Sequence, residues 1–175
     1  MELGFAVDRD EVRRLLNTNS RSGLRLLPGV EKLLFHLHQH GVPMAVATGA
    51  TRENYAFTMK DFPPEITSLL GPVICSDDEE LGGRVKPDAE YYRLAGRRFH
   101  SPPKSMASVL IFEDSITGIQ GALESGGQTA LVTKWKEATF TEENRPLIER
   151  VDLVLETLEE FVPEDFGLPP YSESE

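Results

Sequence analysis

The chain has 175 residues, of which 39% are hydrophobic, a size and composition that suit one globular domain. Its 18 basic and 29 acidic residues give a formal net charge of −11, which argues against a nucleic-acid binder or a membrane-surface protein, because both functions reward a basic face. A lone cysteine, Cys75, excludes an intrachain disulfide, and no run approaches the roughly 20 apolar residues that span a bilayer, so we predict a soluble, cytoplasmic monomer.

The predicted elements alternate between helix and strand. After a polar stretch at 17–23, apolar residues at helical spacing predict a helix over 31–40. Strands are predicted over 42–48, 73–75, 109–112, 128–132 and 151–155, and further helices over 52–59, 89–99 and 117–124. This order is typical of an α/β fold built on a parallel sheet. The final residues, 169–175, have the composition of a disordered acidic tail.

Two neighbouring carboxylates, Glu113 and Asp114, follow directly after the apolar run at 109–112. A run that is apolar on both faces suits a buried parallel strand, and ligands of open α/β sheets bind beyond the carboxyl ends of the strands. Adjacent carboxylates repel each other and are costly to desolvate, so Mg²⁺ is their natural partner. The alternative interpretation is that this pair only caps the following helix.

Two further strand-to-helix turns carry groups that suit a phosphate. Thr48 ends a predicted strand, and its hydroxyl and the amides of Gly49 and Ala50 are placed to bind one anion. Lys86 precedes Pro87 before the helix at 89–99, where its ammonium is a point-charge partner for phosphate. Each turn has a plainer interpretation, a helix N-cap for Thr48 and an exposed surface lysine for Lys86.

Taken together and in this order, the three turns resemble the haloacid dehalogenase superfamily of phosphohydrolases. The matching residues are Thr48 for the second motif of that family, Lys86 and Pro87 for the third, and Glu113, Asp114, Ser115 and Gly118 for the fourth. The likeness runs over residues 27–171 and is strongest to phosphatases of sugar and nucleotide phosphates of the pseudouridine-5′-phosphatase kind. The sequence departs from the usual pattern at Ala89, where a proline is common, and at Gly121, where an alanine is usual.

The resemblance implies a Rossmann-like, three-layer parallel sheet and a Mg²⁺-dependent phosphatase acting on a small phosphorylated metabolite. It implies that Thr48, Gly49, Ala50 and Lys86 hold the transferring phosphoryl group, and that Asp114, with Glu113 directly or through water, holds the metal. In such enzymes an aspartate on the first, central strand attacks phosphorus, and a second aspartate two residues later is the general acid and base.

Before the second motif, Asp8 and Asp10 form the only Asp-x-Asp pair. In one interpretation, residues 3–7 form the first strand, Asp8 is the nucleophile and Asp10 the acid and base, as in capless members. In the other, Asp8 is a helix N-cap and Glu11 its partner in a capping box. We favour the capping box, because Glu11 and Val12 stand where the family has a glycine and a small residue, and Glu11 adds negative charge beside the site.

On the favoured interpretation, residues 1–23 are a remnant of a helical cap, residues 24–168 form the core, and the first central strand and most of the cap are missing. The strands ending at Thr48 and Phe112 must then pair directly or leave buried backbone groups unpaired. We therefore expect a family member whose catalysis is impaired. The alternatives are a non-catalytic phosphoester-binding or regulatory protein, and a capless phosphatase that uses Asp8 and Asp10.

Several other polar residues are assigned to the surface. His36, His38 and His40 alternate along a predicted helix, which spreads them around it instead of gathering them for a metal. The acidic run at 77–80 is interpreted as a solvated loop.

Overall fold

The structure is a computed structural model that describes residues 25–134 and 139–172. Its strands are β1 (Val46–Ala47), β2 (Val73–Ile74), β3 (Leu110–Glu113), β4 (Gln128–Val132) and β5 (Leu153–Leu155). Its α-helices are α2 (Val30–Gln39), α3 (Arg52–Met59), α4 (Pro64–Thr67), α5 (Glu90–Arg97), α6 (Ile116–Ser125) and α8 (Arg145–Ile148). Short 3₁₀ turns are η1 (Glu79–Leu81), η2 (Met106–Ser108), η3 (Leu158–Glu160) and η4 (Pro163–Phe166).

The strands pair in parallel, which confirms the predicted α/β class. β1 pairs with β2, with Val46 opposite Val73, and β3, β4 and β5 form a second ladder in that order. Three strands are shorter than predicted: 42–48 reduces to β1, 73–75 to β2 and 151–155 to β5. β1 and β2 are short because, among the described residues, each has a partner on one side only.

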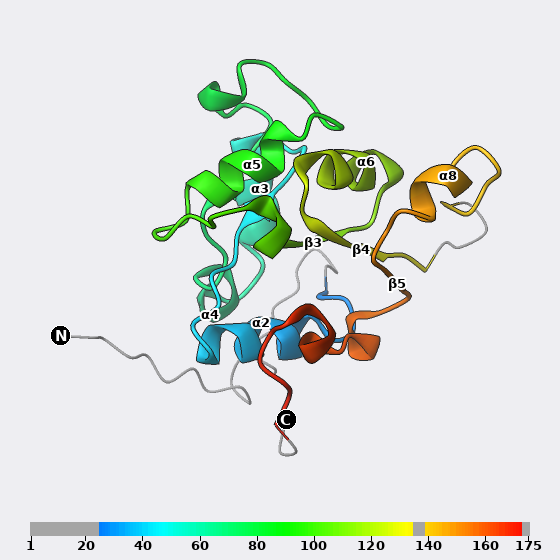
Figure 1. Cartoon of the computed structure of the whole chain (residues 1–175). Helices are drawn as coiled ribbons and strands as arrows, with labels where there is room; N and C mark the ends of the chain where they lie inside the picture. The colour runs from blue at the N-terminus through cyan, green and yellow to red at the C-terminus, as the bar shows by residue number, and fades with distance from the viewer. Residues whose placement is uncertain (1–24, 135–138, 173–175) are drawn as a thin grey trace.

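Helices cover both faces of the strands, which gives the three layers of a Rossmann-like fold. In Figure 1, α2 lies on one side of β3 and β4, and α5 and α6 lie on the other. Two apolar clusters involve α2: Phe35 packs with Ile66 and Leu69, and Leu33 and Leu37 pack with a cluster around β5 and η3. Among the described residues, no helix is long and apolar enough to cross a membrane.

Between β1 and β3 the sheet is interrupted. No ladder connects these two strands within the described residues, so the expected direct pairing is not formed. A cavity of about 500 Å³ lies there instead. Its walls come from α2, α5 and both strands, and they include Leu33, Leu37, Ala47, Ala95, Leu110 and Phe112. Among the described residues, β1 and β3 therefore have no neighbouring strand on the side of this cavity.

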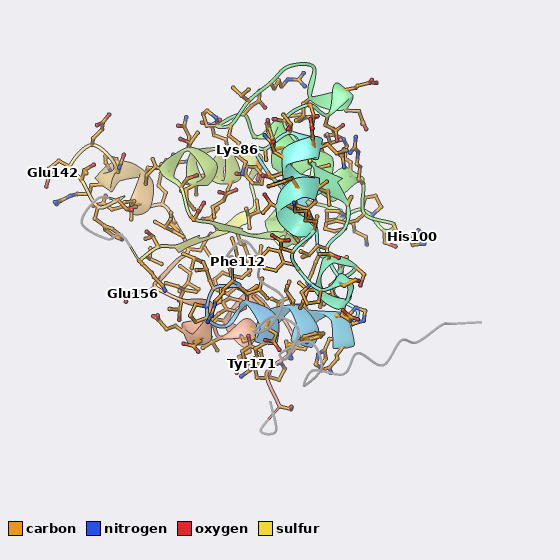
Figure 2. The ribbon with its side chains drawn as sticks, turned by 180° about the vertical axis from the view of Figure 1, so that it is seen from behind. Lys86, His100, Phe112, Glu142, Glu156 and Tyr171 are labelled. Carbon is orange, nitrogen blue, oxygen red and sulfur yellow. The ribbon has the colours of Figure 1, made fainter. Side chains whose placement is uncertain are left out.

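The surface assignment of the histidines and the predicted disorder of the tail are each wrong for part of their residues. His36 is fully buried, and its Nε2 lies 2.8 Å from the carbonyl oxygen of Pro169. The tail was expected to be disordered from residue 169, yet residues 169–172 pack on α2, where Lys32 Nζ lies 3.8 Å from the centre of the Tyr171 ring (Figure 2). The tail follows α2 because it gives the buried imidazole a hydrogen-bond partner and the lysine an aromatic face.

The acidic loop is also more ordered than predicted. Asp78 is a bidentate partner of Arg98, with 2.6 Å for each nitrogen–oxygen pair, and its side chain is only 7% exposed. Glu80 accepts a further bond from the same guanidinium. The sequence did not indicate this ion pair, because Arg98 lies 20 residues after Asp78.

Candidate phosphate and metal site

An ion pair between Lys86 and Glu113 lies at the centre of the candidate site. The Lys86 Nζ donates to Glu113 Oε1 at 2.5 Å, and the two side chains are only 16% and 9% exposed. β3 delivers Glu113 at its carboxyl end, and the turn before α5 delivers Lys86. Figure 2 shows Lys86 on the α5 and α6 side of the sheet, whereas Phe112 lies between the sheet and α2. The third and fourth sequence motifs therefore meet in space, as their resemblance implied.

Tyr92 is a third member of this group, and the sequence did not single it out. Its hydroxyl lies 2.7 Å from Glu113 Oε1 and 2.9 Å from the carbonyl oxygen of Gly118. Burial, together with the negative charge of Glu113, raises the pKa of Tyr92, so the phenol stays neutral and remains a donor. The Lys86 ammonium lies 5.0 Å from the centre of the Tyr92 ring, which adds a cation–π contact. Both Tyr91 and Tyr92 are buried on α5, and nothing in the sequence distinguishes them.

Two glycines of α6 make room for this group. A Cβ on Gly118 would lie 2.0 Å from Glu113 Oε2, and a Cβ on Gly121 would lie 2.5 Å from the carbonyl oxygen of Pro87. The absence of both side chains lets the helix approach the Glu113 carboxylate and the Lys86–Pro87 segment. The departure at Gly121, where the family usually has alanine, therefore has a steric reason in this chain. The amide of Gly118 donates to Ser115 Oγ at 3.0 Å, which caps α6.

The turn after β1 is organised by its own hydrogen bonds. The Thr48 hydroxyl accepts from the amide of Ala50 at 3.1 Å, so its proton stays available to a ligand. Gly49 is exposed and Thr48 is half-buried, so this turn opens to solvent. The N-cap of α3 is Thr51, whose hydroxyl accepts from the amide of Asn54, so the capping role considered for Thr48 belongs to Thr51.

The metal-ligating role predicted for Glu113 and Asp114 is only partly compatible with their surroundings. Asp114 is exposed, and its hard oxygen donors suit Mg²⁺. Glu113 Oε1 already has two donors, Lys86 and Tyr92, which leaves Oε2 for a metal or its water. No group of three or more His, Cys, Asp or Glu side chains that suits a metal occurs among the described residues. Because Glu113 Oε2 faces Gly118 of α6 and this side chain is only 9% exposed, Asp114 offers the accessible carboxylate, and phosphate, water or a further carboxylate would have to supply the other ligands of a magnesium ion.

The candidate nucleophile and acid-base pair, Asp8 and Asp10, lie outside the described residues, as does the capping box with Glu11. No described residue supplies a carboxylate from a strand between β1 and β3. The predicted groups in the described residues are thus the Lys86 ammonium, the Thr48 hydroxyl, the Gly49 amide and the exposed Asp114 carboxylate, whereas the Ala50 amide, also expected to bind phosphate, already donates to Thr48. These groups can bind a phosphate and a divalent cation.

Comparison with known proteins identifies the family. Residues 3–126 match the model for haloacid dehalogenase-like hydrolases. The chain is 32% identical over 171 residues to the mitochondrial (DL)-glycerol-3-phosphatase 1 of Arabidopsis thaliana, covering 97% of this chain and 53% of that protein. It is 33% identical over 151 residues to a probable pseudouridine-5′-phosphatase of Drosophila melanogaster, covering 85% of this chain and 61% of the relative.

A solved structure shares the fold. It is a family IA, variant 3 hydrolase of the same superfamily from Entamoeba histolytica, with a TM-score of 0.68 and 21% identity, covering 83% of this chain and 61% of that one. The chain thus spans a little over half the length of the relatives that it matches. Because the family model covers most of the sequence and the motifs of the family meet in the fold, this chain belongs to the haloacid dehalogenase-like hydrolases.

Proposed function

We propose that this chain binds the phosphate of a small phosphomonoester together with Mg²⁺, in the manner of a phosphatase whose own turnover is impaired. The observation that carries the proposal is the buried Lys86–Glu113 pair at the carboxyl end of β3, beside the exposed Asp114. A nearly buried ammonium at this edge is the type of group that binds a phosphoryl oxygen. The names of two relatives, a glycerol-3-phosphatase and a pseudouridine-5′-phosphatase, support a sugar or nucleotide phosphate as ligand.

Each residue has a distinct proposed role. Lys86 gives positive charge to one phosphoryl oxygen, and Thr48 donates its hydroxyl proton to another. The free amide of Gly49 is a further donor at the same turn. Asp114 holds the metal directly and Glu113 contributes Oε2. When bound, Mg²⁺ offsets the negative charge that the carboxylates and the phosphate bring together.

Turnover is expected to be impaired because no described residue supplies the nucleophilic carboxylate. The candidate pair Asp8 and Asp10 is followed by Glu11, whose negative charge would oppose an approaching phosphate. The distribution of charge also limits long-range steering of an anion: eight acidic residues and no Lys or Arg occur between Val151 and Glu175.

Calorimetry with Mg²⁺ and glycerol 3-phosphate or pseudouridine 5′-phosphate tests the binding proposal. We expect binding that needs Mg²⁺ and weakens at least about tenfold in Lys86→Met, because a charge-assisted bond of about 1.5 to 3 kcal/mol is lost. Lys104→Met, which removes an exposed lysine elsewhere, is the matched control and should bind as the parent does. Binding of neither phosphate to the parent chain would contradict the proposal.

Phosphate release from an aryl phosphate tests the impairment. We expect no release above the Mg²⁺-only background. Release that disappears in Asp8→Asn but persists in Glu11→Ala would instead identify a capless phosphatase that uses Asp8.

A further inference from the structure

The loop at 75–78, which follows β2, holds the turn at 48–50 that carries proposed phosphate donors. The amide of Thr48 donates to the carbonyl oxygen of Ile74, and the amide of Ser76 donates to the carbonyl oxygen of Ala50, each at 2.9 Å. These two bonds continue the parallel pairing of β1 and β2 beyond the ends of both strands. The backbone of the turn is therefore fastened to the loop at every second residue.

A side chain of the loop extends this attachment to the next helix. Asp77 Oδ1 accepts from the amide of Arg52 at 2.9 Å, and Arg52 is the first residue of α3. The first amides of a helix have no acceptor within the helix, and a carboxylate at this end satisfies one of them and complements the helix dipole. Asp77 thus fixes the point at which α3 begins, directly after the turn.

These bonds decide which amides of the turn are left for a ligand. The amides of Thr48 and Arg52 are directed to the loop, and the amide of Ala50 donates to the Thr48 hydroxyl. Successive residues of an extended segment direct their backbone groups to opposite sides, so the amide of Gly49 faces away from β2. A turn held in this shape offers the Gly49 amide and the Thr48 hydroxyl proton to an anion.

The loop itself is fixed to α5. Asp78 accepts two bonds of 2.6 Å from Arg98 at the end of α5, and Leu94 of the same helix packs with Ile74 of β2. The segment that carries Lys86 leads directly into the start of α5. One helix therefore anchors both segments that carry the proposed phosphate donors, Lys86 at its beginning and, through the loop, the turn at 48–50.

We propose that Asp77 is a positioning residue of the phosphate site. Its carboxylate holds the start of α3 against the loop, and this contact keeps the turn at 48–50 in the shape that presents its donors to a phosphoryl oxygen. The inference rests on the proposed function, because the turn has this role only where the chain binds a phosphate. Asp77 acts through the Arg52 amide and does not itself contact the ligand.

The charge of Asp77 makes this role testable, because position and charge act in opposite directions. Asp77 is exposed and negative, so its charge opposes an anion at the neighbouring turn. If charge were its main effect, removal of the carboxylate would strengthen phosphate binding. If positioning is its main effect, removal weakens phosphate binding although the repulsion is also removed.

Calorimetry with glycerol 3-phosphate and Mg²⁺ compares three variants with the parent chain. We expect Asp77→Ala to weaken binding at least about threefold, because the Arg52 amide loses its acceptor. Asp77→Asn keeps an acceptor oxygen and should bind at least as tightly as the parent. Glu79→Ala is the matched control, because it removes the same charge from an exposed position of η1, two residues further along, and should not weaken binding.

Hydrogen exchange of the Arg52 amide gives a second readout that needs no ligand. We expect exchange at least about threefold faster in Asp77→Ala than in the parent chain, and unchanged exchange in Glu79→Ala. A variant that merely lowers global stability would accelerate exchange throughout the core, whereas loss of this contact acts on the start of α3.

Three results would overturn the role of Asp77 alone. These are binding by Asp77→Ala that equals or exceeds that of the parent chain, binding by Asp77→Asn that is as weak as that of Asp77→Ala, and exchange of the Arg52 amide that is the same in Asp77→Ala and the parent. A parent chain that binds no phosphate would instead contradict the proposed function, and with it any positioning role at a phosphate site.

Discussion

At the scale of single residues, Tyr92 decides how Glu113 is used. Without the phenol, one oxygen of Glu113 would have only Lys86 as a partner in a nearly buried position. With it, Glu113 Oε1 is held from two elements at once, and Oε2 is left to face α6 at Gly118. Glu113 Oε1 is therefore occupied by the ion pair with Lys86 and the bond from Tyr92, and only Oε2 is left for a metal.

Replacing Tyr92 by phenylalanine tests this role. We expect Tyr92→Phe to lower the free energy of unfolding by about 1 to 3 kcal/mol, because a hydrogen bond to a buried charged group is lost. Urea denaturation at pH 7 measures the change. The matched control is Tyr91→Phe, which removes a weaker bond of 3.3 Å to the carbonyl oxygen of Arg84 and should cost less. A larger loss in Tyr91→Phe than in Tyr92→Phe would refute the assignment.

Gly118 gives a second prediction at this scale. In Gly118→Ala the added Cβ would lie 2.0 Å from Glu113 Oε2, so the carboxylate or the helix must move. We expect a loss of about 1 to 3 kcal/mol in the free energy of unfolding, as is usual for overpacking. In Gly96→Ala on α5 the Cβ would lie 3.3 Å from the flexible end of Met106 and 3.5 Å from the Pro103 ring, an ordinary contact distance, so this variant should be neutral or stabilising. Thermal denaturation of the two variants compares them directly.

At the scale of elements, the pair of Asp78 and Arg98 ties the loop after β2 to the end of α5. Hydrogen bonds from Arg98 lower the pKa of Asp78 despite its burial, and the same contact raises the pKa of Arg98. The charged carboxylate is therefore the form that the fold stabilises. This contribution is complete above the ordinary pKa of an aspartate and is lost as the pH falls through the lower value of the folded state.

Arg98→Gln should consequently have a pH-dependent effect. We expect it to cost about 2 kcal/mol at pH 7, and we expect the difference from the parent chain to shrink as the pH falls from about 5 to about 2. Urea midpoints measured across this range follow the difference. Arg97→Gln, which breaks a more exposed pair with Glu90, should cost less than about 1 kcal/mol at neutral pH. A difference that does not change with pH would exclude Asp78 as the titrating partner.

The elements also show how far sequence reasoning reaches. Periodicity located α2 and α6 to within one or two residues, because each helix buries one regular face. It missed α4 and α8, which have four residues each and show no period. In the site, the order of the motifs predicted that Lys86 and Glu113 lie close together. It could not predict their direct ion pair or the hydrogen bond from Tyr92 to Glu113, because both depend on how closely α5 approaches α6.

At the scale of the whole molecule, the C-terminal end of the described chain packs on α2, near its N-terminal end. Pro169 and Tyr171 lie against His36. His36 and Pro169 are 133 residues apart in the sequence. A carbonyl oxygen and an aromatic ring thus cover a buried imidazole that the alternating spacing of the histidines assigned to the surface.

Removing the tail tests its contribution. A chain ending at Leu168 should unfold with about 1 to 3 kcal/mol less free energy, because the hydrogen bond between the buried His36 Nε2 and the Pro169 carbonyl oxygen is lost. A chain that lacks only residues 173–175 is the matched control and keeps both contacts, so it should match the full chain. Equal urea midpoints for the two truncations would show that the contact with His36 contributes nothing.

Helix α2 has a consequence that extends beyond its own packing. Phe35 packs with Ile66 and Leu69, in the segment that connects β1 to β2, whereas Leu33 and Leu37 contact the cluster beside β5. Since no hydrogen-bond ladder among the described residues joins the two groups of strands, cooperative unfolding has to be transmitted through such helices. Leu37→Ala should therefore do more than lower stability: it should split one calorimetric transition into two, with a calorimetric enthalpy above the van't Hoff value.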